Sequence, residues 1–173
     1  STAFITGATG FVGSHAARHF LAEGWRVRAL VRDPGRRGLL PPGVEVVPGE
    51  LSAGGYDAGL EGCDAVVHVA GVTKGRSLAE YSAVNAEGTA ALVRAASAAS
   101  PAARFVLVSS QSAAGPSRGG APVREGDPPR PVSWYGASKL AGENAVAEGW
   151  KGPWSVVRPS VVYSMRVMLP AAT

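Results

Sequence analysis

The chain has 173 residues, of which 46% are hydrophobic and 17% charged, and its formal net charge is +4. This composition excludes a disordered chain, because a sequence of this length and apolar content can bury a core of its own. Cys63 is the single cysteine, which excludes an internal disulfide framework or a thiolate metal cluster and fits a reducing cytoplasm. We expect one domain over residues 1–173, with no metal site.

The sequence also argues against membrane and nucleic-acid partners. No stretch reaches the roughly 18 unbroken apolar residues of a membrane span, and Ser1 to Gly7 lack a basic segment ahead of an apolar one. We therefore expect a soluble, cytoplasmic protein without a targeting segment. The basic residues are scattered, with Arg36-Arg37 the only adjacent pair. This favours a solvated surface over a nucleic-acid site.

Short apolar runs alternate with helical stretches along the chain. The pattern predicts strands at 3–6, 26–31, 44–47, 65–70, 105–108 and 155–158, and helices at 11–23, 79–99 and 135–148. A loop rich in Pro, Gly and Arg follows the second strand, and 110–132 reads as a long irregular loop of functional length. Such alternation is typical of an α/β fold, a doubly wound parallel sheet with helices on both faces.

Three glycines, Gly7, Gly10 and Gly13, stand between the first predicted strand and its helix. In such a turn the first glycine permits the tight bend, the second lets the backbone approach a pyrophosphate, and the third allows close packing of helix on strand. The helix N-terminus adds unpaired N–H groups and a partial positive charge. The sequence therefore predicts a dinucleotide site, the alternative being a glycine-rich turn that binds nothing.

The end of the second predicted strand indicates which dinucleotide binds. An acidic side chain there would hold a ribose 2′-hydroxyl, whereas an arginine favours a 2′-phosphate. Arg32 stands at this position, with Arg36 and Arg37 as further candidates, so NADP is preferred. NAD is the alternative, with the next residue, Asp33, rotated into the ribose role.

Tyr135 and Lys139 lie four residues apart on a predicted helix, and hence one turn apart on the same face. A neighbouring ammonium favours the ionised phenol, which suits Tyr135 to general acid/base catalysis. A hydroxyl that orients a substrate oxygen is expected at the carboxyl end of the fifth predicted strand, where Ser109-Ser110-Gln111-Ser112 stands. The alternative is that these serines cap backbone groups.

Thr-Gly-x-x-Gly-x-x-Gly at 6–13, together with Tyr-Gly-Ala-Ser-Lys at 135–139, resembles the short-chain dehydrogenase/reductase superfamily, and in particular its extended branch, the NAD(P)-dependent epimerase/dehydratase family. The resemblance implies an NAD(P)-binding Rossmann fold. It also implies three catalytic residues: Ser110, with Ser112 as second choice, Tyr135 and Lys139. Glu50-Leu51 stand where the family usually has Asp-Leu beside the adenine ring.

Segments 68–71 and 157–163 also match the family, and Asn85 matches its helix asparagine, which we expect to form a hydrogen bond. His68 is interpreted as a packed strand residue rather than a catalyst, because it alternates with apolar neighbours. The predicted cofactor-binding residues are Gly7, Thr9, Gly10, Phe11, Val12, Gly13, Arg32, Glu50, Leu51, Val69, Ala70, Gly71, Asn85, Val108, Tyr135, Lys139, Pro159 and Val161.

The implied function is that of an NAD(P)-dependent oxidoreductase, epimerase or dehydratase, moving hydride between the nicotinamide and a carbonyl or alcohol carbon of a small molecule or nucleotide sugar. Arg32 favours a net reductase. The alternative is a dinucleotide sensor or binding module without catalysis. The resemblance also implies a homodimer through helices 79–99 and 135–148. The matched motifs span essentially the whole sequence but only part of the family's length, so we expect a fragment that lacks the C-terminal substrate lobe.

Overall fold

The computed structural model describes residues 1–117 and 119–163. Its centre is a six-stranded sheet in the order β3-β2-β1-β4-β5-β6, in which every neighbouring pair is parallel. The strands are β1 Thr2–Thr6, β2 Arg26–Val31, β3 Glu45–Pro48, β4 Ala65–His68, β5 Arg104–Val108 and β6 Trp154–Val157. The strand order reverses between β1 and β4, which is where ligands bind in open sheets of this kind. The predicted doubly wound parallel sheet is confirmed.

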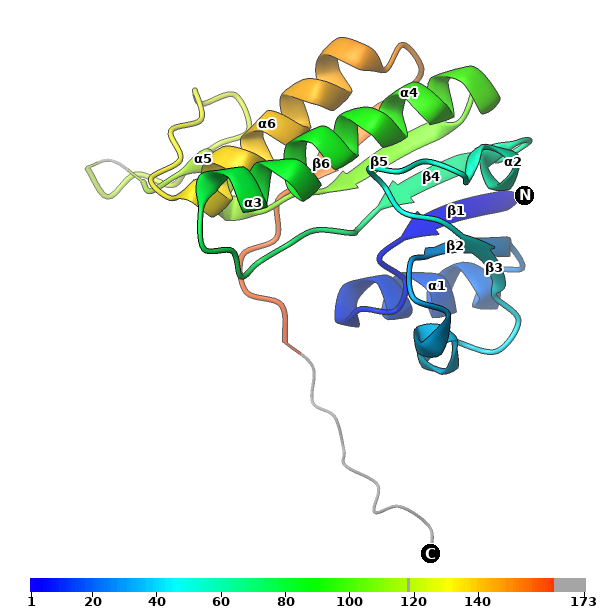
Figure 1. Cartoon of the computed structure of the whole chain (residues 1–173). Coiled ribbons are helices and arrows are strands. Elements are labelled where there is room, and N and C mark those ends of the chain that lie inside the picture. The colour runs from blue at the N-terminus through cyan, green and yellow to red at the C-terminus, as the bar shows by residue number, and fades with distance from the viewer. Residues whose placement is uncertain (118, 164–173) are drawn as a thin grey trace, which may run out of the picture.

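Helices cover both faces of the sheet, with α1 on one side and α3, α4 and α6 on the other (Figure 1). The helical segments are α1 Phe11–Ala22, η1 Pro34–Leu39, α2 Asp57–Leu60, α3 Leu78–Ser82, η2 Ala83–Gly88, α4 Thr89–Ala99, α5 Gln111–Ala114 and α6 Trp134–Gly149. No helix among the residues described here is long and apolar enough to cross a membrane.

Two apolar cores follow from the alternation of side chains along the strands. In β1, Phe4 points to the core beneath α4 and α6, whereas Ala3 and Ile5 point to the core beneath α1. All three side chains are fully buried. Because successive residues of a strand face opposite sides of the sheet, a strand covered on both sides reads as a continuous apolar run.

The stretch predicted as one helix over 79–99 is not a regular α-helix. Between α3 and α4, residues Ala83–Gly88 form a π-helical segment. The Oγ1 of Thr89 donates a 2.8 Å hydrogen bond to the carbonyl oxygen of Asn85 within this segment. Gly142 of α6 packs so tightly against the same oxygen that a Cβ there would clash with it. The wider turn thus accommodates the contact between the two helices, and π turns are often found at functional sites.

Two predicted loops contain short helices. The segment after β2 forms the 3₁₀ helix η1, begun by Asp33, whose carboxylate accepts a 2.9 Å hydrogen bond from the N–H of Gly35. The predicted loop at 110–132 begins with α5, which Ser110 caps. Both helices are set by a local side-chain cap, which the composition of a Gly- and Pro-rich stretch does not reveal.

Candidate cofactor and active site

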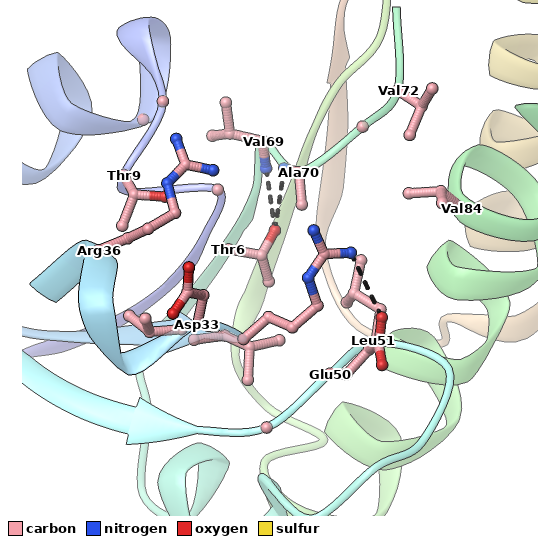
Figure 2. A pocket seen from close by; sticks show the side chains of 18 of the residues that line it. Thr6, Thr9, Asp33, Arg36, Glu50, Leu51, Val69, Ala70, Val72 and Val84 are labelled. Atoms are coloured by element: carbon pink, nitrogen blue, oxygen red, sulfur yellow. Dashed lines mark hydrogen bonds and ion pairs between the residues drawn. The ribbon is translucent and has the colours of Figure 1, made fainter. Parts of the chain in front are cut away.

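A cavity of about 690 Å³ lies where β1, β2, β3 and β4 end, a volume within the roughly 300–1,000 Å³ of typical ligand pockets. Figure 2 shows Thr9, Asp33 and Arg36 at one end of it and Val72 and Val84 at the other. Twelve of the predicted cofactor-binding residues line this cavity: Gly7, Thr9, Gly10, Phe11, Val12, Gly13, Arg32, Glu50, Leu51, Val69, Ala70 and Gly71.

Two glycines of the turn are required by its geometry. Gly7 has a φ of 71°, and a Cβ on it would lie 2.7 Å from the backbone nitrogen of Ala70. A Cβ on Gly13 would clash with the carbonyl oxygen of Gly7. The backbones of the turn, α1 and the segment after β4 therefore meet at distances that only glycine allows. This close approach shapes the wall of the cavity.

The N-terminus of α1 is open to an anionic ligand. Its N-cap, Gly10, has no side chain that accepts a hydrogen bond, and the first turn contains no acidic residue. The N–H groups of this turn are therefore available, and the helix dipole adds a partial positive charge. Both features match the pyrophosphate of a dinucleotide, so the residues present fit NAD(P).

Charged side chains surround the end of the cavity next to β2 and β3. The guanidinium of Arg32 lies 3.4 Å from a carboxylate oxygen of Glu50, and both side chains are substantially exposed. Asp33 and Arg36 also line the cavity, and the Oδ1 of Asp33 accepts the hydrogen bond that caps η1. Two guanidinium groups and two carboxylates thus flank this end, with Arg32 paired to Glu50 and Asp33 hydrogen-bonded to the backbone of η1.

The segment that follows β4 is held from two sides. The Oγ1 of Thr6 accepts hydrogen bonds from the N–H groups of Val69 and Ala70, at 3.2 and 3.1 Å (Figure 2). The amide of Asn85 accepts a 2.9 Å bond from the N–H of Val72 and donates a 3.0 Å bond to the carbonyl oxygen of Val72. Asn85 therefore forms the hydrogen bonds expected of it and anchors one wall of the cavity.

Lys139 is buried behind the end of this wall. Its Nζ donates a 2.8 Å hydrogen bond to the carbonyl oxygen of Val108, and it lies 3.7 Å from the position that a Cβ on Gly71 would take. Burial lowers the pKa of the Lys139 ammonium from 10.5 to about 8, against the opposing effect of the Glu143 carboxylate. The ammonium thus sits at the border between α6 and the cavity.

Glu143 ties α6 to the ends of β5 and β6. Its buried carboxylate accepts a 2.5 Å hydrogen bond from the hydroxyl of Ser109. It also accepts two bonds from Arg158, at 2.9 Å from Nε and 2.5 Å from Nη2. A paired, hydrogen-bonded charge of this kind fixes the rotation of the helix one turn after Lys139.

Tyr135 lies in the first turn of the same helix but faces a second cleft, of about 660 Å³. Its ring lies against that of Tyr81 in α3, with ring centroids 5.9 Å apart. None of the residues that line this cleft is charged; they are Gly75, Tyr81, Pro131, Val132, Ser133, Trp134, Tyr135 and Ala137. The cleft therefore presents aromatic and small apolar surfaces beside the phenol.

Ser110 lies at the end of β5 and is 8% exposed. Its Oγ accepts a 3.1 Å hydrogen bond from the N–H of Ser112, the capping interaction that was the alternative interpretation. A hydroxyl that accepts one bond still has its hydrogen to donate. Gly136 packs directly against the carbonyl oxygen of Ser112, which brings this segment next to the first turn of α6.

The remaining predicted cofactor-binding residues lie outside the cavity lining. Val108 provides the acceptor for Lys139, and the carbonyl oxygen of Pro159 accepts a 3.0 Å bond from the N–H of Gln111. Val161 is 79% exposed. Sequence reasoning missed nine further lining residues: Thr6, Leu30, Val31, Gly49, Ser52, Val72, Thr73, Ala83 and Val84. Most of them directly adjoin a recognised motif, which is the signal that would have found them.

Comparison with known proteins agrees with this geometry. The sequence profile described as "NAD dependent epimerase/dehydratase family" matches residues 3–170. The chain is 41% identical to a ceramide reductase of Caulobacter vibrioides, over 92% of this chain and 45% of that protein. It is 32% identical to a quinoline-oxide ketoreductase of Stigmatella aurantiaca, over 92% of this chain and 50% of the other.

Among solved structures, the Bordetella bronchiseptica enzyme WbmG in complex with NAD and UDP has a TM-score of 0.77 and 29% sequence identity. The match covers 90% of this chain and 52% of that protein. The chain thus spans about half the length of the relatives that it matches.

Proposed function

The chain belongs to the NAD dependent epimerase/dehydratase family. From this premise we propose that it is the cofactor-binding part of an NADP(H)-dependent carbonyl reductase. The observation that carries the proposal is the position of Lys139, which lies on the same helix as Tyr135. Its Nζ is hydrogen-bonded to the carbonyl oxygen of Val108 and lies directly behind Gly71 of the cofactor cavity. This arrangement gives a buried ammonium beside the predicted cofactor site, one helical turn after the predicted acid/base residue.

When bound, the cofactor supplies hydride chemistry at its nicotinamide ring. In the proposed mechanism, Ser110 donates its hydroxyl hydrogen to the substrate oxygen, and Tyr135 delivers a proton to that oxygen. Lys139 stabilises the phenolate that remains and binds the cofactor ribose. The tight closure of α6 on Ser112 supports this assignment, because it brings the Ser110 segment and Tyr135 to the same end of the helix.

The preference for NADP rests on Arg32 and Arg36, which flank one end of the cavity. Guanidinium groups bind a 2′-phosphate through charge-assisted hydrogen bonds. Asp33 lines the same end, but one oxygen of its carboxylate already accepts the N–H of Gly35 as the cap of η1, which supports the same assignment.

The lining of the second cleft supports a substrate with an apolar body. An uncharged, aromatic wall next to Tyr135 suits an aromatic or alkyl ketone better than a densely hydroxylated sugar. The two curated relatives named above are reductases of compounds with large apolar portions. A nucleotide-sugar epimerase is the second candidate, favoured by the structural similarity to an enzyme that binds NAD and UDP.

We further propose that the protein is a cytoplasmic homodimer. The buried, reduced thiol of Cys63 suits a reducing compartment, and α4 and α6 are the helices that the resemblance assigns to the subunit interface. Light scattering of the purified chain tests the second point, because a monomeric mass would overturn it.

Substitution of Tyr135 by Phe tests the proposed reaction. The variant keeps the ring beside Tyr81 but has no proton to transfer, so NADPH-dependent turnover of an aromatic ketone should fall by roughly 100-fold or more, while NADPH binding is retained. Tyr163, an exposed tyrosine, provides the matched control Tyr163→Phe, which should leave turnover unchanged. Equal, measurable turnover in wild type and Tyr135→Phe would overturn the mechanism, whereas NADPH binding without turnover in either protein would make the dinucleotide sensor the better account.

A further inference from the structure

His68 is a buried titratable residue to which the proposed reaction assigns no role. It ends β4 and is 1% exposed. Both ring nitrogens are nevertheless engaged, Nδ1 with the Oγ1 of Thr6 at 2.6 Å and Nε2 with the Oγ1 of Thr89 at 2.9 Å. One partner lines the cofactor cavity and the other stands next to the π segment.

The direction of these hydrogen bonds follows from counting hydrogens. Thr89 donates its only hydroxyl hydrogen to the carbonyl oxygen of Asn85, so its oxygen must accept from His68, and Nε2 therefore carries a hydrogen. Burial, with the Lys139 ammonium as a second cause, lowers the pKa of His68 to about 3, which leaves the ring neutral with one N–H. Its Nδ1 must then accept from Thr6.

A single directed chain of hydrogen bonds results. The N–H groups of Val69 and Ala70 donate to Thr6, Thr6 donates to His68, His68 donates to Thr89, and Thr89 donates to the carbonyl oxygen of Asn85. Every hydroxyl in the chain uses its one hydrogen in the same direction. Such a chain has one favourable arrangement, because reversal of any member leaves a buried donor facing another donor.

The two ends of this chain lie at functionally distinct places. One end is the backbone after β4, against which Gly7 packs at the wall of the cofactor cavity. The other is the carbonyl oxygen of Asn85, on which Gly142 of α6 rests so closely that no Cβ would fit. The position of α6 relative to the sheet therefore depends on where this oxygen is held.

The side chain of Asn85 makes a second connection between the same places. Besides its two bonds to Val72, its amide donates a 3.0 Å hydrogen bond to the Oγ of Ser138. Ser138 in turn donates a 2.8 Å bond to the carbonyl oxygen of Tyr135. Displacement of the Asn85 turn would thus move the first two turns of α6, which carry Tyr135 and Lys139.

We propose that His68 is a positioning residue. As a neutral imidazole with its hydrogen on Nε2, it fixes the position of the π turn at Asn85. Through that turn it fixes the position of α6 on the sheet, and hence the placement of Tyr135 and Lys139 relative to the cofactor cavity. The functional part of this inference rests on the proposed reductase function, whereas the structural part can be measured without turnover.

The test compares three variants of the full chain with wild type. In His68→Gln, an amide can still accept from Thr6 and donate to Thr89, whereas His68→Leu removes both bonds. Val67→Ala is the matched control, because Val67 is also buried in β4 but faces the opposite core. The control loses core packing without touching the hydrogen-bond chain.

Two spectroscopic results are expected. In the ¹⁵N spectrum of the histidine side chains, the signal that disappears in His68→Gln should be that of a neutral ring protonated at Nε2, unchanged between pH 5 and 8. The backbone amide signals of residues 135–139 should shift in His68→Leu, return toward wild type in His68→Gln, and stay in place in Val67→Ala. A ring protonated at Nδ1, or unshifted α6 amides in His68→Leu, would overturn the inference.

Kinetics with NADPH and an aromatic ketone give the third readout. His68→Leu should lower kcat on the order of 10- to 100-fold at nearly unchanged KM for NADPH, because the reacting groups are misplaced while the cavity persists. His68→Gln should recover most of that loss. If wild type binds NADPH without turnover, the proposed reductase function fails, and the two spectroscopic results still decide the positioning role. If His68→Leu does not fold, the ring tautomer in wild type and the α6 amides of His68→Gln decide it.

Discussion

The Nζ of Lys139 and the carbonyl oxygen of Val108 lie 2.8 Å apart, so the ammonium of α6 is bonded to the last residue of β5. This bond crosses from the helix that carries Tyr135 to the strand that leads into Ser110. It holds a positive charge in a buried place at the border of the cofactor cavity. Burial of a positive charge lowers the free energy of unfolding, and this loss can be measured as a dependence of stability on pH.

Substitution of Lys139 by Met should change the pH dependence of stability. The pKa of Lys139 is about 8 in the folded chain against an ordinary 10.5, so the folded state binds fewer protons than the unfolded state between these values. Stability of wild type relative to Lys139→Met should therefore rise with pH in this window, by about 2 kcal/mol from pH 7 to 10. Urea unfolding of both proteins at several pH values provides the measurement. A difference that is constant with pH would show that the ammonium is not buried as described.

The buried imidazole of His68 makes a prediction of the same sign at acid pH. Because the pKa of His68 is lowered to about 3, the unfolded state binds a proton below pH 6.5 that the folded state does not. The contribution of His68 is thus fully present above pH 6.5 and is lost as the pH falls, by about 2–4 kcal/mol at pH 4. His68→Gln, which cannot take up this proton, should lose less stability between pH 6.5 and 4 than wild type does. Identical acid unfolding curves would contradict this.

Gly13→Ala tests the cradle of the cofactor site. The added Cβ would clash with the carbonyl oxygen of Gly7, which must shift to accommodate it. We expect a destabilisation of about 1–3 kcal/mol and a loss of dinucleotide affinity. Gly38→Ala is the matched control, because a Cβ there meets open space and its φ is not positive. Thermal unfolding and NADPH titration of both variants measure the difference, and similar behaviour of the two would be incompatible with the tight turn.

Arg32→Ala should separate cofactor choice from stability. The Arg32–Glu50 ion pair is exposed, so its loss should change stability by less than about 1 kcal/mol. The affinity for NADPH should fall while that for NADH stays near its wild-type value, since only the 2′-phosphate contact is removed. Arg37→Ala serves as the control, because Arg37 is not among the residues that line the cavity. Equal weakening of NADH and NADPH would assign Arg32 to a contact shared by both cofactors.

The parts of the site that were predictable from the sequence are those determined by local chemistry. The glycine turn could be recognised because Gly7 and Gly13 are each required by backbone contacts within a strand, turn and helix that adjoin in sequence. Tyr135 and Lys139 could be placed on one face because helical periodicity fixes their relation. The parallel sheet followed from the alternation of apolar runs and helical stretches.

The parts that were not predictable depend on contacts between distant segments. The π turn at Asn85 exists where Gly142 of α6 packs onto its carbonyl oxygen, and nothing in the local stretch 79–99 reveals that partner. His68 likewise lies between the hydroxyls of Thr6 and Thr89, which are 62 and 21 residues away in the sequence, so its local stretch does not reveal these partners. Similarly, the hydrogen bond by which Asp33 caps η1 forms only once the segment after β2 turns into a 3₁₀ helix, which the sequence alone did not indicate.

The measurement that tests the account most directly is a fluorescence titration of the purified chain with NADPH and with NADH at the same moderate salt concentration. The open N-terminus of α1, the glycine turn and the two guanidinium groups predict saturable binding of both, with NADPH clearly tighter. Tighter binding of NADH would transfer the ribose contact from Arg32 to Asp33 and favour the epimerase candidate. Absence of saturable binding by either dinucleotide would contradict the central claim that this cavity is a cofactor site.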